Sequence, residues 1–566
     1  AVLARVRPGR ESVSTIAEQG RSRNASAARR LACSDAGRQH RAPARICGGD
    51  VRAIDSAEAS ARASEPKPRG TSSHRSSSSS SSNSSARLCG PSANGASTDM
   101  ARGPIVVAPL AAPLDDVTWE VPGSKSITNR ALILAALRDG RTRLRGVLHS
   151  DDTRHMRNAL TALGIEIVEE DATTFLVSGG TRRLRAPEKE LFIGNSGTSV
   201  RFLCAFCCLV PGDVTLVGDE HMAKRPIGDL KSALEQMGVE VDCPTGCPPI
   251  TIKGQSLPGG KVSMPGNKSS QYFSALMLSG CFAAEELHIQ VEGTLVSLPY
   301  VEMTIKMVKA FGNDIEHDKE ANNFVVKKAA GAASAEEADL LEYVIEPDAS
   351  SASYPFALAA ATGSSVKVPN LNGESMQGDF GFTEVLQKMG CTVEVGSDFT
   401  RVTGPSRGSL AGVDVDMHHI SDTVMSLAAI APLCSSPVTI RNVANIRIKE
   451  TDRLEATVNE LKRLGQNVTS GDDWLKIEPV LPITPAEIQC YADHRMAMSF
   501  AVLGMAVEGV TITDPDCTAK TYPGFWEDLD RVRGDAAAAA EPPTKKAKSE
   551  AESAADALVT AQVAEQ

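Results

Sequence analysis

Residues 121–132 read VPGSKSITNRAL, and an almost wholly apolar run continues from there to Leu137. Glycine, lysine and serine at a helix start suggest a nucleotide-binding loop. That loop requires the pattern G-x-x-x-x-G-K-[ST], with glycine directly before the lysine. Here Ser124 precedes Lys125, and no glycine stands five residues before Ser124. The stretch is therefore not a P-loop, and its lysine needs another explanation.

Five further segments share this character and recur at intervals of roughly 70 to 80 residues. They read GTSVRFLCAFCCL, SSQYFSALMLSG, SSASYPFALAAATG, SDTVMSLAAIAPL and DHRMAMSFAVLG. A helix that is apolar on all sides must be buried. Capping explains the Ser, Thr and Asp residues at the starts, but cations there oppose the helix dipole. The pattern predicts six buried helices whose positive ends face a common site for a strongly anionic ligand.

A second series of segments ends in an apolar residue, a glycine and a short alternating run, as in ALTALGIEIVE and LQKMGCTVEV. A glycine just past a helix supplies the left-handed C′ conformation, and the alternation after it predicts a strand. A sixth segment, FWEDLDRVRG, predicts a helix that ends at Gly534. The six glycines, spaced 74, 74, 78, 75 and 69 residues apart, are Gly164, Gly238, Gly312, Gly390, Gly465 and Gly534. The chain is therefore predicted to be an α/β protein of six helix–strand units.

The two ends of the chain differ from this middle. Residues 1–100 hold 16 Lys and Arg against 8 Asp and Glu, which leaves −19 for the rest of a chain whose net charge is −11. With SSSSSSS at 76–82, residues 1–100 are predicted to be a disordered extension. It is either an organelle transit segment or not part of the mature protein, since the first methionine is Met100. Residues 535–566 are predicted to be a second disordered tail, whose KKAK is a solvated charge run rather than a nuclear address.

The composition argues against several classes of site. Cys204 and Cys207 lie in an apolar segment, and Cys243 and Cys247 lack partners at zinc spacing, so buried thiols are expected and no metal. No run of 18 apolar residues occurs, so no membrane span is expected. Aromatic residues are only 4% and the globular part is acidic, which argues against nucleic acid.

Basic residues stand beside Gly, Ser, Thr or Asn at the predicted helix starts and turns. Bidentate arginines and point-charge lysines suit phosphates and carboxylates. Carboxylates are interleaved with them, and a carboxylate among cations can have a tuned pKa and serve as acid or base. Taken singly, each of these side chains could equally be a surface charge or a cap. The cations are Lys125, Arg130, Arg201, Arg225, Lys449, Arg453, Arg495 and Lys520, and the carboxylates are Asp348, Asp422, Glu450, Asp452 and Asp493.

Nine motifs, in order, carry a resemblance to a known family. They are PGSKSITNRAL, GNSGTSVRF, RPIGDL, SSQYFSALM, SLPYVEMT, DASSASY, IKETDRL, ADHRMAMSF and DCTAKTYPGF. Over residues 105–533 the chain resembles the 5-enolpyruvylshikimate-3-phosphate (EPSP) synthases, the 3-phosphoshikimate 1-carboxyvinyltransferases (EC 2.5.1.19) of the enolpyruvyl transferase family.

The resemblance implies a two-lobed inside-out α/β barrel. Each lobe would hold three βαβαββ units around buried helices whose N-termini face the cleft between the lobes. The N-terminal lobe would be residues 124–346, and the C-terminal lobe would combine 101–123 with 347–534.

The resemblance also implies a reaction of the shikimate pathway, which leads to chorismate and the aromatic amino acids. The enolpyruvyl group of phosphoenolpyruvate would pass to the 5-hydroxyl of shikimate 3-phosphate, with release of phosphate through a tetrahedral intermediate and with closure of the lobes. No cofactor is implied. A monomer is expected, in the plastid stroma if residues 1–99 are a transit segment and otherwise in the cytoplasm. Gly197 and Thr198 imply inhibition by glyphosate, although Phe202 stands where bacterial and plant members commonly carry proline.

By the same resemblance, Asp422, helped by Lys125, would take the proton of the 5-hydroxyl, and Glu450 would give a proton to C3. Shikimate 3-phosphate would be held by Lys125, Ser126, Arg130, Ser269, Ser270, Gln271, Ser297, Tyr300, Asp422, Asn445 and Lys449. Phosphoenolpyruvate would be held by Lys125, Asn195, Gly197, Arg225, Gln271, Arg453, Arg495 and Lys520. Supporting positions would be Arg201, Asp348 and His494.

Three alternatives compete with this interpretation. The related transferase that acts on UDP-N-acetylglucosamine has a different loop after its lysine and a reactive cysteine on a mobile loop, which none of the 13 cysteines matches. A catalytically dead binding protein of the same fold is disfavoured by the intact Lys125, Asp422, Glu450 and Arg495. A fragment of a multifunctional pathway protein is disfavoured because the flanks show no kinase P-loop.

Overall fold

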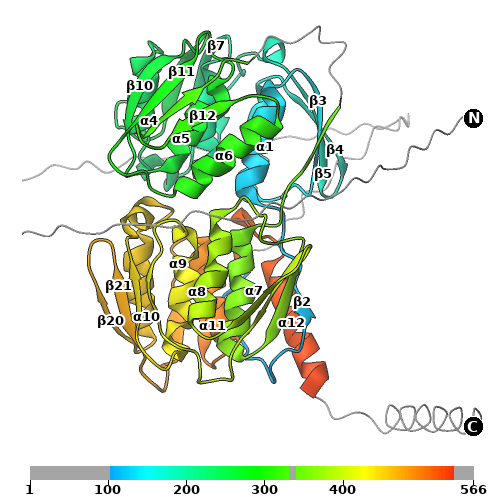
Figure 1. The fold of residues 1–566 in the computed structure, drawn as a ribbon, viewed down its shortest axis with the longest axis vertical. Helices are drawn as coiled ribbons and strands as arrows, with labels where there is room; N and C mark the ends of the chain where they lie inside the picture. The colour runs from blue at the N-terminus through cyan, green and yellow to red at the C-terminus, as the bar shows by residue number, and fades with distance from the viewer. Residues whose placement is uncertain (1–101, 330–339, 541–566) are drawn as a thin grey trace, which may run out of the picture. The chain divides into compact units, whose positions relative to one another are not determined.

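A computed structural model describes residues 102–329 and 340–540, with side chains as far as Gly534. The expectations for residues 1–100, and those for the tail beyond residue 540, lie outside this range. The described chain forms six small sheets and two sets of buried helices (Figure 1).

One repeating unit is complete within a continuous stretch of chain. It runs β6 (Leu191–Phe192), α3 (Gly197–Cys207), β7 (Gly212–Val217), α4 (Gly228–Gln236), β8 (Val241–Asp242) and β9 (Ile250–Gly254). Strand β6 pairs parallel with β7, whereas β9 pairs antiparallel with both β7 and β8. This is a βαβαββ unit, with sheet order β6-β7-β9-β8.

Two further units repeat this order. One has strands β10 (Gly260–Pro265), β11 (Leu287–Glu292), β12 (Ile315–Asp318) and β13 (Asn323–Val326), with helices α5 (Ser270–Gly280) and α6 (Leu298–Ala310). The other has strands β18 (Asp414–Asp416), β19 (Val438–Arg441), β20 (Asn467–Ser470) and β21 (Leu475–Glu478), with helices α9 (Val424–Ile430) and α10 (Arg453–Arg463).

Two units borrow their first strand from a distant part of the chain. Strand β14 (Leu341–Val344) pairs parallel with β3 (Gly140–Arg145), in a sheet with β4 (Glu166–Asp171) and β5 (Thr174–Gly179). Strand β2 (Val117–Thr118) pairs parallel with β15 (Ser365–Pro369), in a sheet with β16 (Thr392–Val395) and β17 (Phe399–Thr403). Their helices are α1 (Lys125–Leu137), α2 (Asp151–Ala162), α7 (Ala349–Thr362) and α8 (Phe382–Lys388).

The two segments that leave β2 and β14 run side by side. The Ser124 amide donates to the Glu346 carbonyl at 2.8 Å, and the Asp348 amide donates to the Pro122 carbonyl at 2.8 Å. Gly123 between them has no room for a side chain, because a Cβ there would lie 1.8 Å from the Gly146 carbonyl oxygen.

The sixth unit differs from its prediction. Helix α12 (Phe525–Ala540) does not end at Gly534 but continues into the segment predicted to be a disordered tail. The alanine run after Gly534 has high helix propensity and carries the helix onward. The sixth sheet has the order β1-β23-β22. Strand β23 (Val510–Ile512) pairs parallel with β22 (Ala486–Ile488) and antiparallel with β1 (Ile105–Val107), which comes from the start of the described chain.

The other five helix–strand junctions are as predicted. Their glycines have φ between 78° and 101°, which is the left-handed conformation of a C′ residue, and each is followed by a strand.

The apolar helices pack into two separate hydrophobic cores. The first runs from Ile127 to Ile345 and defines what we call the first lobe. The second joins Val107 to Trp119 with Ala349 to Val532 and defines the second lobe. Every residue of α3, α7, α9 and α11 (His494–Gly504) is buried, and α1 and α5 are nearly so, which confirms the six predicted buried helices.

Within the described range no helix is long and apolar enough to cross a membrane. Cys204 and Cys207 are buried in α3, as expected, and no described cysteine is in a disulfide.

Candidate active site

Residues from the starts of α1, α3, α5 and α11 meet in one cavity of about 30 Å³ between the lobes, together with Asp422 from the turn before α9, whereas the start of α7 does not line it. Lys125 stands at the start of α1, Gly197 at the start of α3 and Arg495 in the first turn of α11. The first residue of α10, Arg453, also reaches it. The lining is almost entirely charged or polar, and its residues are Lys125, Asp152, Gly197, Thr198, Arg201, Arg225, Gln271, Asp422, Lys449, Glu450, Arg453 and Arg495.

A second cavity of about 40 Å³ adjoins the first and is richer in hydroxyl groups. The two share Lys125, Thr198, Gln271, Asp422 and Lys449. The second cavity also has Ser126, Lys268, Ser269, Ser270, Val296, Ser297, Tyr300 and Asn445.

Hydroxyl and amide groups bridge the lobes at this second cavity. The Asn445 side-chain amide donates to the hydroxyl of Ser297 at 3.2 Å and to that of Ser421 at 3.0 Å. Ser297 has a φ of 52°, a left-handed conformation that is strained for a non-glycine residue. Strain of this kind concentrates at functional sites.

Glu450 is held among three cations. Its carboxylate lies 2.7 Å from Arg453 Nη2, 3.6 Å from Arg225 Nη1 and 3.9 Å from Lys520 Nζ. Burial alone would raise the pKa of this carboxyl, but Arg453, Arg225 and Lys520 outweigh burial and hold its pKa well below the usual range. Glu450 is therefore ionised at neutral pH while these cations face it.

Asp422 lies in the 3₁₀ turn η4 (Ser421–Thr423) before α9. Its Oδ2 accepts from Arg495 at 2.9 Å, and its Oδ1 accepts from Arg453 at 3.2 Å and lies 3.8 Å from Lys449 Nζ. Burial raises the pKa of Asp422, but Arg495 and Lys449 lead a set of cations that hold it far below the ordinary value.

Arg453 pairs with both Glu450 and Asp422 and is itself held in place by Asp493. Its Nε donates to Asp493 Oδ2 at 2.7 Å, and Asp493 also caps α11 by accepting from the Arg495 amide at 3.0 Å. The next residue, His494, is buried, and neither ring nitrogen has a hydrogen-bond partner among the described residues. Burial and the nearby Lys125 hold the pKa of His494 well below its usual value, so its ring is neutral.

Asp152, at the start of α2, joins the two lobes. It accepts from Lys520 Nζ at 2.9 Å and lies 3.3 Å from Lys125 Nζ. Lys520 belongs to the second lobe, in the 3₁₀ turn η7 (Pro515–Lys520), and it also donates to the Asn195 carbonyl.

Arg225 is positioned by the loop before α3. Its Nη1 donates to Asn195 Oδ1 at 3.1 Å and to the Asn195 carbonyl at 3.2 Å. A Cβ on Gly197 would lie 2.5 to 2.8 Å from the guanidinium atoms of Arg225. The missing side chain of Gly197 therefore makes room for this arginine.

Gln271 and Arg201 brace the floor of the cavity. Arg201 Nη1 donates to Gln271 Oε1 at 2.6 Å, and Gln271 Nε2 donates to Thr198 Oγ1 at 3.1 Å. Asp348 caps α7 by accepting from the amides of Ser350 at 2.9 Å and Ser351 at 3.2 Å.

Arg130, like Asn195 and Lys520, is a predicted binding residue that lines neither cavity. It is 1% exposed and donates to Thr304 at 2.8 Å, to Ser274 at 3.1 Å and to the carbonyls of Ser126 and Tyr300. Burial lowers its pKa to about 10. The Phe202 ring lies under its guanidinium at 5.1 Å, so Phe202 contacts Arg130 rather than lining a cavity.

Two buried carboxylates were not among the predicted site residues. Asp152 is indistinguishable in sequence from its neighbour Asp151 as an ordinary acid in the first turn of a helix. Asp379 stands in the 3₁₀ turn η3 (Gly378–Gly381), where the sequence MQGDFGF carries no signal of burial. The burial of these two carboxylates cannot be recognised from the sequence, because groups from the other lobe help to bury them.

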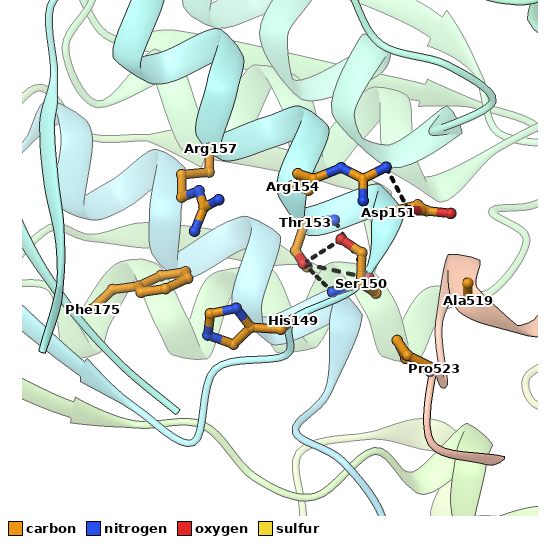
Figure 2. A pocket seen from close by; sticks show the side chains of 9 residues that line it. All are labelled: His149, Ser150, Asp151, Thr153, Arg154, Arg157, Phe175, Ala519 and Pro523. Carbon is orange, nitrogen blue, oxygen red and sulfur yellow. Dashed lines mark hydrogen bonds and ion pairs between the residues drawn. The ribbon is translucent and has the colours of Figure 1, made fainter. Parts of the chain in front are cut away.

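Two larger cavities share no lining residue with the two cavities described above. One, of about 290 Å³, lies at the start of α2, where Ser150 caps the helix, Asp151 pairs with Arg154, and His149 faces Phe175 (Figure 2). The other, of about 870 Å³, is bordered by the two segments that leave β2 and β14, which we call the crossing segments. Neither contains a predicted site residue. Among the described residues, no group of His, Cys, Asp and Glu is arranged to hold a metal ion.

Comparison with known proteins gives one consistent result. Residues 114–529 match the family model for EPSP synthase (3-phosphoshikimate 1-carboxyvinyltransferase). The chain is 45% identical over 414 residues to a 3-phosphoshikimate 1-carboxyvinyltransferase from Nostoc punctiforme, covering 73% of this chain and 95% of that one. It is 43% identical over 419 residues to a protein of the same name from Serratia proteamaculans, covering 73% of this chain and 96% of that one.

Solved structures agree. An EPSP synthase structure from Acinetobacter baumannii matches with a TM-score of 0.63 at 26% identity, covering 76% of this chain and 98% of that chain. The shared fold, the motifs and the sequence identity over nearly the full length of these relatives place the chain in the EPSP synthase family.

Proposed function

We propose that the protein transfers the enolpyruvyl group of phosphoenolpyruvate to the 5-hydroxyl of shikimate 3-phosphate and releases phosphate. The observation that carries the proposal is the cavity between the lobes. There six cations, three of them on the buried helices α1, α3 and α11, lie together with Asp422 and Glu450. Both substrates carry a phosphate and a carboxylate, which are the groups that helix starts, arginines and lysines bind. The enzyme is thus a 3-phosphoshikimate 1-carboxyvinyltransferase.

The linings of the two adjoining cavities match the chemical groups of the two substrates. The lining of the first, with Arg225, Arg453 and Arg495, suits phosphoenolpyruvate, whose phosphate and carboxylate are both anionic. The second, with several serine hydroxyls, suits the hydroxylated ring of shikimate 3-phosphate. Lys125 and Gln271 line both cavities and lie where the reacting atoms would meet.

The chemistry needs a proton acceptor for the 5-hydroxyl and a proton donor for C3 of the enol. Asp422 is ionised and lies between the cavities, so it is the acceptor. Glu450 is the donor, and the negative charges of phosphoenolpyruvate at Arg225 and Lys520 would raise its proton affinity. The resulting tetrahedral intermediate loses phosphate as Glu450 takes the C3 proton back.

The lobes would close over the substrates and exclude water, which strengthens each charge interaction. We assign residues 124–346 to one lobe and residues 101–123 with 347–534 to the other, which places the hydrogen-bonded crossing segments at the hinge. On this proposal the enzyme acts as a monomer on small molecules, without nucleic acid or membrane. Its compartment, plastid stroma or cytoplasm, depends on whether residues 1–99 act as a transit segment.

Phosphate release from phosphoenolpyruvate, with and without shikimate 3-phosphate, tests the proposal. Release is expected only with both substrates. Release without shikimate 3-phosphate, or with UDP-N-acetylglucosamine in its place, contradicts it. Glyphosate should inhibit this release at saturating shikimate 3-phosphate, and an uninhibited enzyme contradicts that part.

Asp422→Asn and Glu450→Gln test the assigned roles. Each keeps the shape of the side chain but removes the group that exchanges a proton, so turnover should fall roughly 10²- to 10⁴-fold. Steady-state kinetics on both variants provides the measurement. A variant with full turnover shows that its assigned role is wrong.

A further inference from the structure

A buried carboxylate near the site has no part in the mechanism above. Asp379 is only 2% exposed, and its Oδ2 accepts hydrogen bonds from the Tyr300 hydroxyl at 3.0 Å and from the Ser350 hydroxyl. Its Oδ1 is buried without a hydrogen-bond partner among the described residues. Leaving a buried carboxylate oxygen unpaired is unfavourable, so the position calls for an explanation.

Tyr300 links this carboxylate to Asp422. Its hydroxyl lies 3.0 Å from Asp379 Oδ2 and 3.3 Å from Asp422 Oδ2. A phenol has one proton, so it donates to one carboxylate and can accept from the other when that one is protonated. Asp422, Tyr300 and Asp379 therefore form a continuous hydrogen-bonded chain. The chain is built across the cleft, because Tyr300 belongs to the first lobe and both carboxylates to the second.

The charges around this hydrogen-bonded chain favour protonation of Asp379 over protonation of Asp422. Asp422 faces Arg495 and Arg453, which disfavour its protonated form. Asp379 faces Asp422 from η4, Tyr300 from α6 and Ser350 from α7, and the nearby cation that opposes its protonation is Arg495 of α11. Burial and the charge of Asp422 raise the pKa of Asp379 to about 6.

Tyr300 passes a proton rather than holding a charge. Burial and the two carboxylates raise the pKa of Tyr300 well above its usual value, so it remains a neutral phenol.

We propose that Asp379 receives, through Tyr300, the proton that Asp422 removes from the attacking 5-hydroxyl. This inference rests on the proposed function above. The O–H bond of the substrate breaks as its oxygen bonds to C2, and the proton goes to Asp422 Oδ2. Asp422 then passes it to the Tyr300 oxygen while the proton of Tyr300 moves to Asp379 Oδ2. Asp422 is ionised again, Tyr300 is unchanged, nothing is oxidised or reduced, and Asp379 releases its proton to water when the lobes open.

The relay resolves a difficulty in the mechanism. A carboxylate surrounded by cations is a weak base, because the best catalytic pKa lies near the working pH. Asp379 does not touch the substrate and is a positioning residue for the proton. It must be ionised to accept, so kcat of the wild-type enzyme should fall as the pH drops below about 6.

Asp379→Asn tests the relay, because asparagine can still accept from Tyr300 but cannot take up the proton. We expect kcat at pH 7.5 to fall about 10- to 100-fold, less than for loss of the base itself. Both KM values should stay within about threefold of wild type. The fall of kcat below about pH 6, which is the acid limb of the pH profile, should disappear. Tyr300→Phe should remove the same limb, and the double variant should be no slower than the slower single variant, since both break one chain.

Ser350→Ala supplies a second test if Asp379→Asn fails to fold. Losing the hydroxyl that stabilises ionised Asp379 should move the acid limb to higher pH. The relay is overturned if wild-type enzyme works only with both substrates while Asp379→Asn keeps kcat and the acid limb. It is equally overturned if the limb of Ser350→Ala stays in place. Wild-type protein that releases no phosphate instead contradicts the proposed function itself.

Discussion

Gly197 shows how the absence of a single side chain shapes the site. A Cβ there would lie within 2.8 Å of the Arg225 guanidinium, which also contacts Asn195 and Glu450. Gly197→Ala should therefore displace Arg225 and, on the proposed function, weaken its charge-assisted hydrogen bond to phosphoenolpyruvate. A loss of about 1.5 kcal/mol corresponds to a roughly tenfold rise in KM for phosphoenolpyruvate, with a small effect on KM for shikimate 3-phosphate.

Gly228 offers a matched control for this experiment. It begins α4 as Gly197 begins α3, but a Cβ there would meet only Gly246, at 3.9 Å. Gly228→Ala should leave both KM values unchanged. Equal kinetics for the two variants would show that the close approach to Arg225 does not govern phosphoenolpyruvate binding.

Asp379 also predicts a change of stability with pH. The folded chain raises its pKa from 3.8 to about 6, so between these values the folded state holds a proton that the unfolded chain has released. Stability therefore falls as the pH rises through this window, and the full cost of about 3 kcal/mol applies above pH 6. Asp379→Asn does not titrate. Its free energy of unfolding relative to wild type should rise between pH 4.5 and 7.5, as measured by urea denaturation. A difference that does not vary with pH contradicts this.

At the scale of the element, the repeated helix ends provide an internal comparison. Gly164 after α2 and Gly312 after α6 both have positive φ, at 101° and 83°. A Cβ on Gly164 would lie 2.4 Å from the Arg183 carbonyl oxygen, whereas one on Gly312 would meet nothing within 4 Å. Gly312→Ala should cost about 1–2 kcal/mol from backbone strain alone. Gly164→Ala should cost more, because a backbone carbonyl must also move. Urea midpoints of the two variants check this, and equal losses would contradict the clash.

The buried helices were predictable because their sequences leave no polar face. The run from Ile127 to Leu137 and the whole of α3 have to be buried, and they are. The capping interpretation holds for the four helices that start after Ser196, Ser269, Asp348 and Asp493, where a side chain accepts from the helix backbone. It does not hold for α1 and α9, which have no side-chain cap bond.

Long-range pairing was not predictable from periodicity alone. Strand β2 has two residues and β14 has four, which is too short for an alternating pattern to identify. That β2 and β14 each pair with a strand far away in the sequence is evident only from the resemblance to the family and from the structure. The same limit hid Asp152 and Asp379, since the partners that bury them come from segments far away in the chain.

At the scale of the whole molecule, several contacts between the lobes are polar, whereas each lobe has its own apolar core, with Met376 of the second lobe packed against the first core. Lys520 meets Asp152, Arg225 meets Glu450, and Tyr300 meets Asp379 across the cleft. We therefore expect closure to depend on the balance of charge in the cleft more than on apolar burial. Removing one negative charge should leave cations facing one another and favour an open arrangement until an anionic substrate replaces it.

Asp152→Asn tests this balance, because it removes one charge that faces both Lys125 and Lys520. The radius of gyration of the ligand-free variant, measured by small-angle scattering, should exceed that of wild type. Adding shikimate 3-phosphate should bring the two values together, since the ligand supplies the missing negative charge. Asp151→Asn is the control, because Asp151 is adjacent in sequence but pairs with Arg154 on the exposed side of α2 (Figure 2). If Asp152→Asn matches Asp151→Asn without ligand, the charge in the cleft does not control closure, and the hydrogen-bonded crossing segments would have to hold the lobes together.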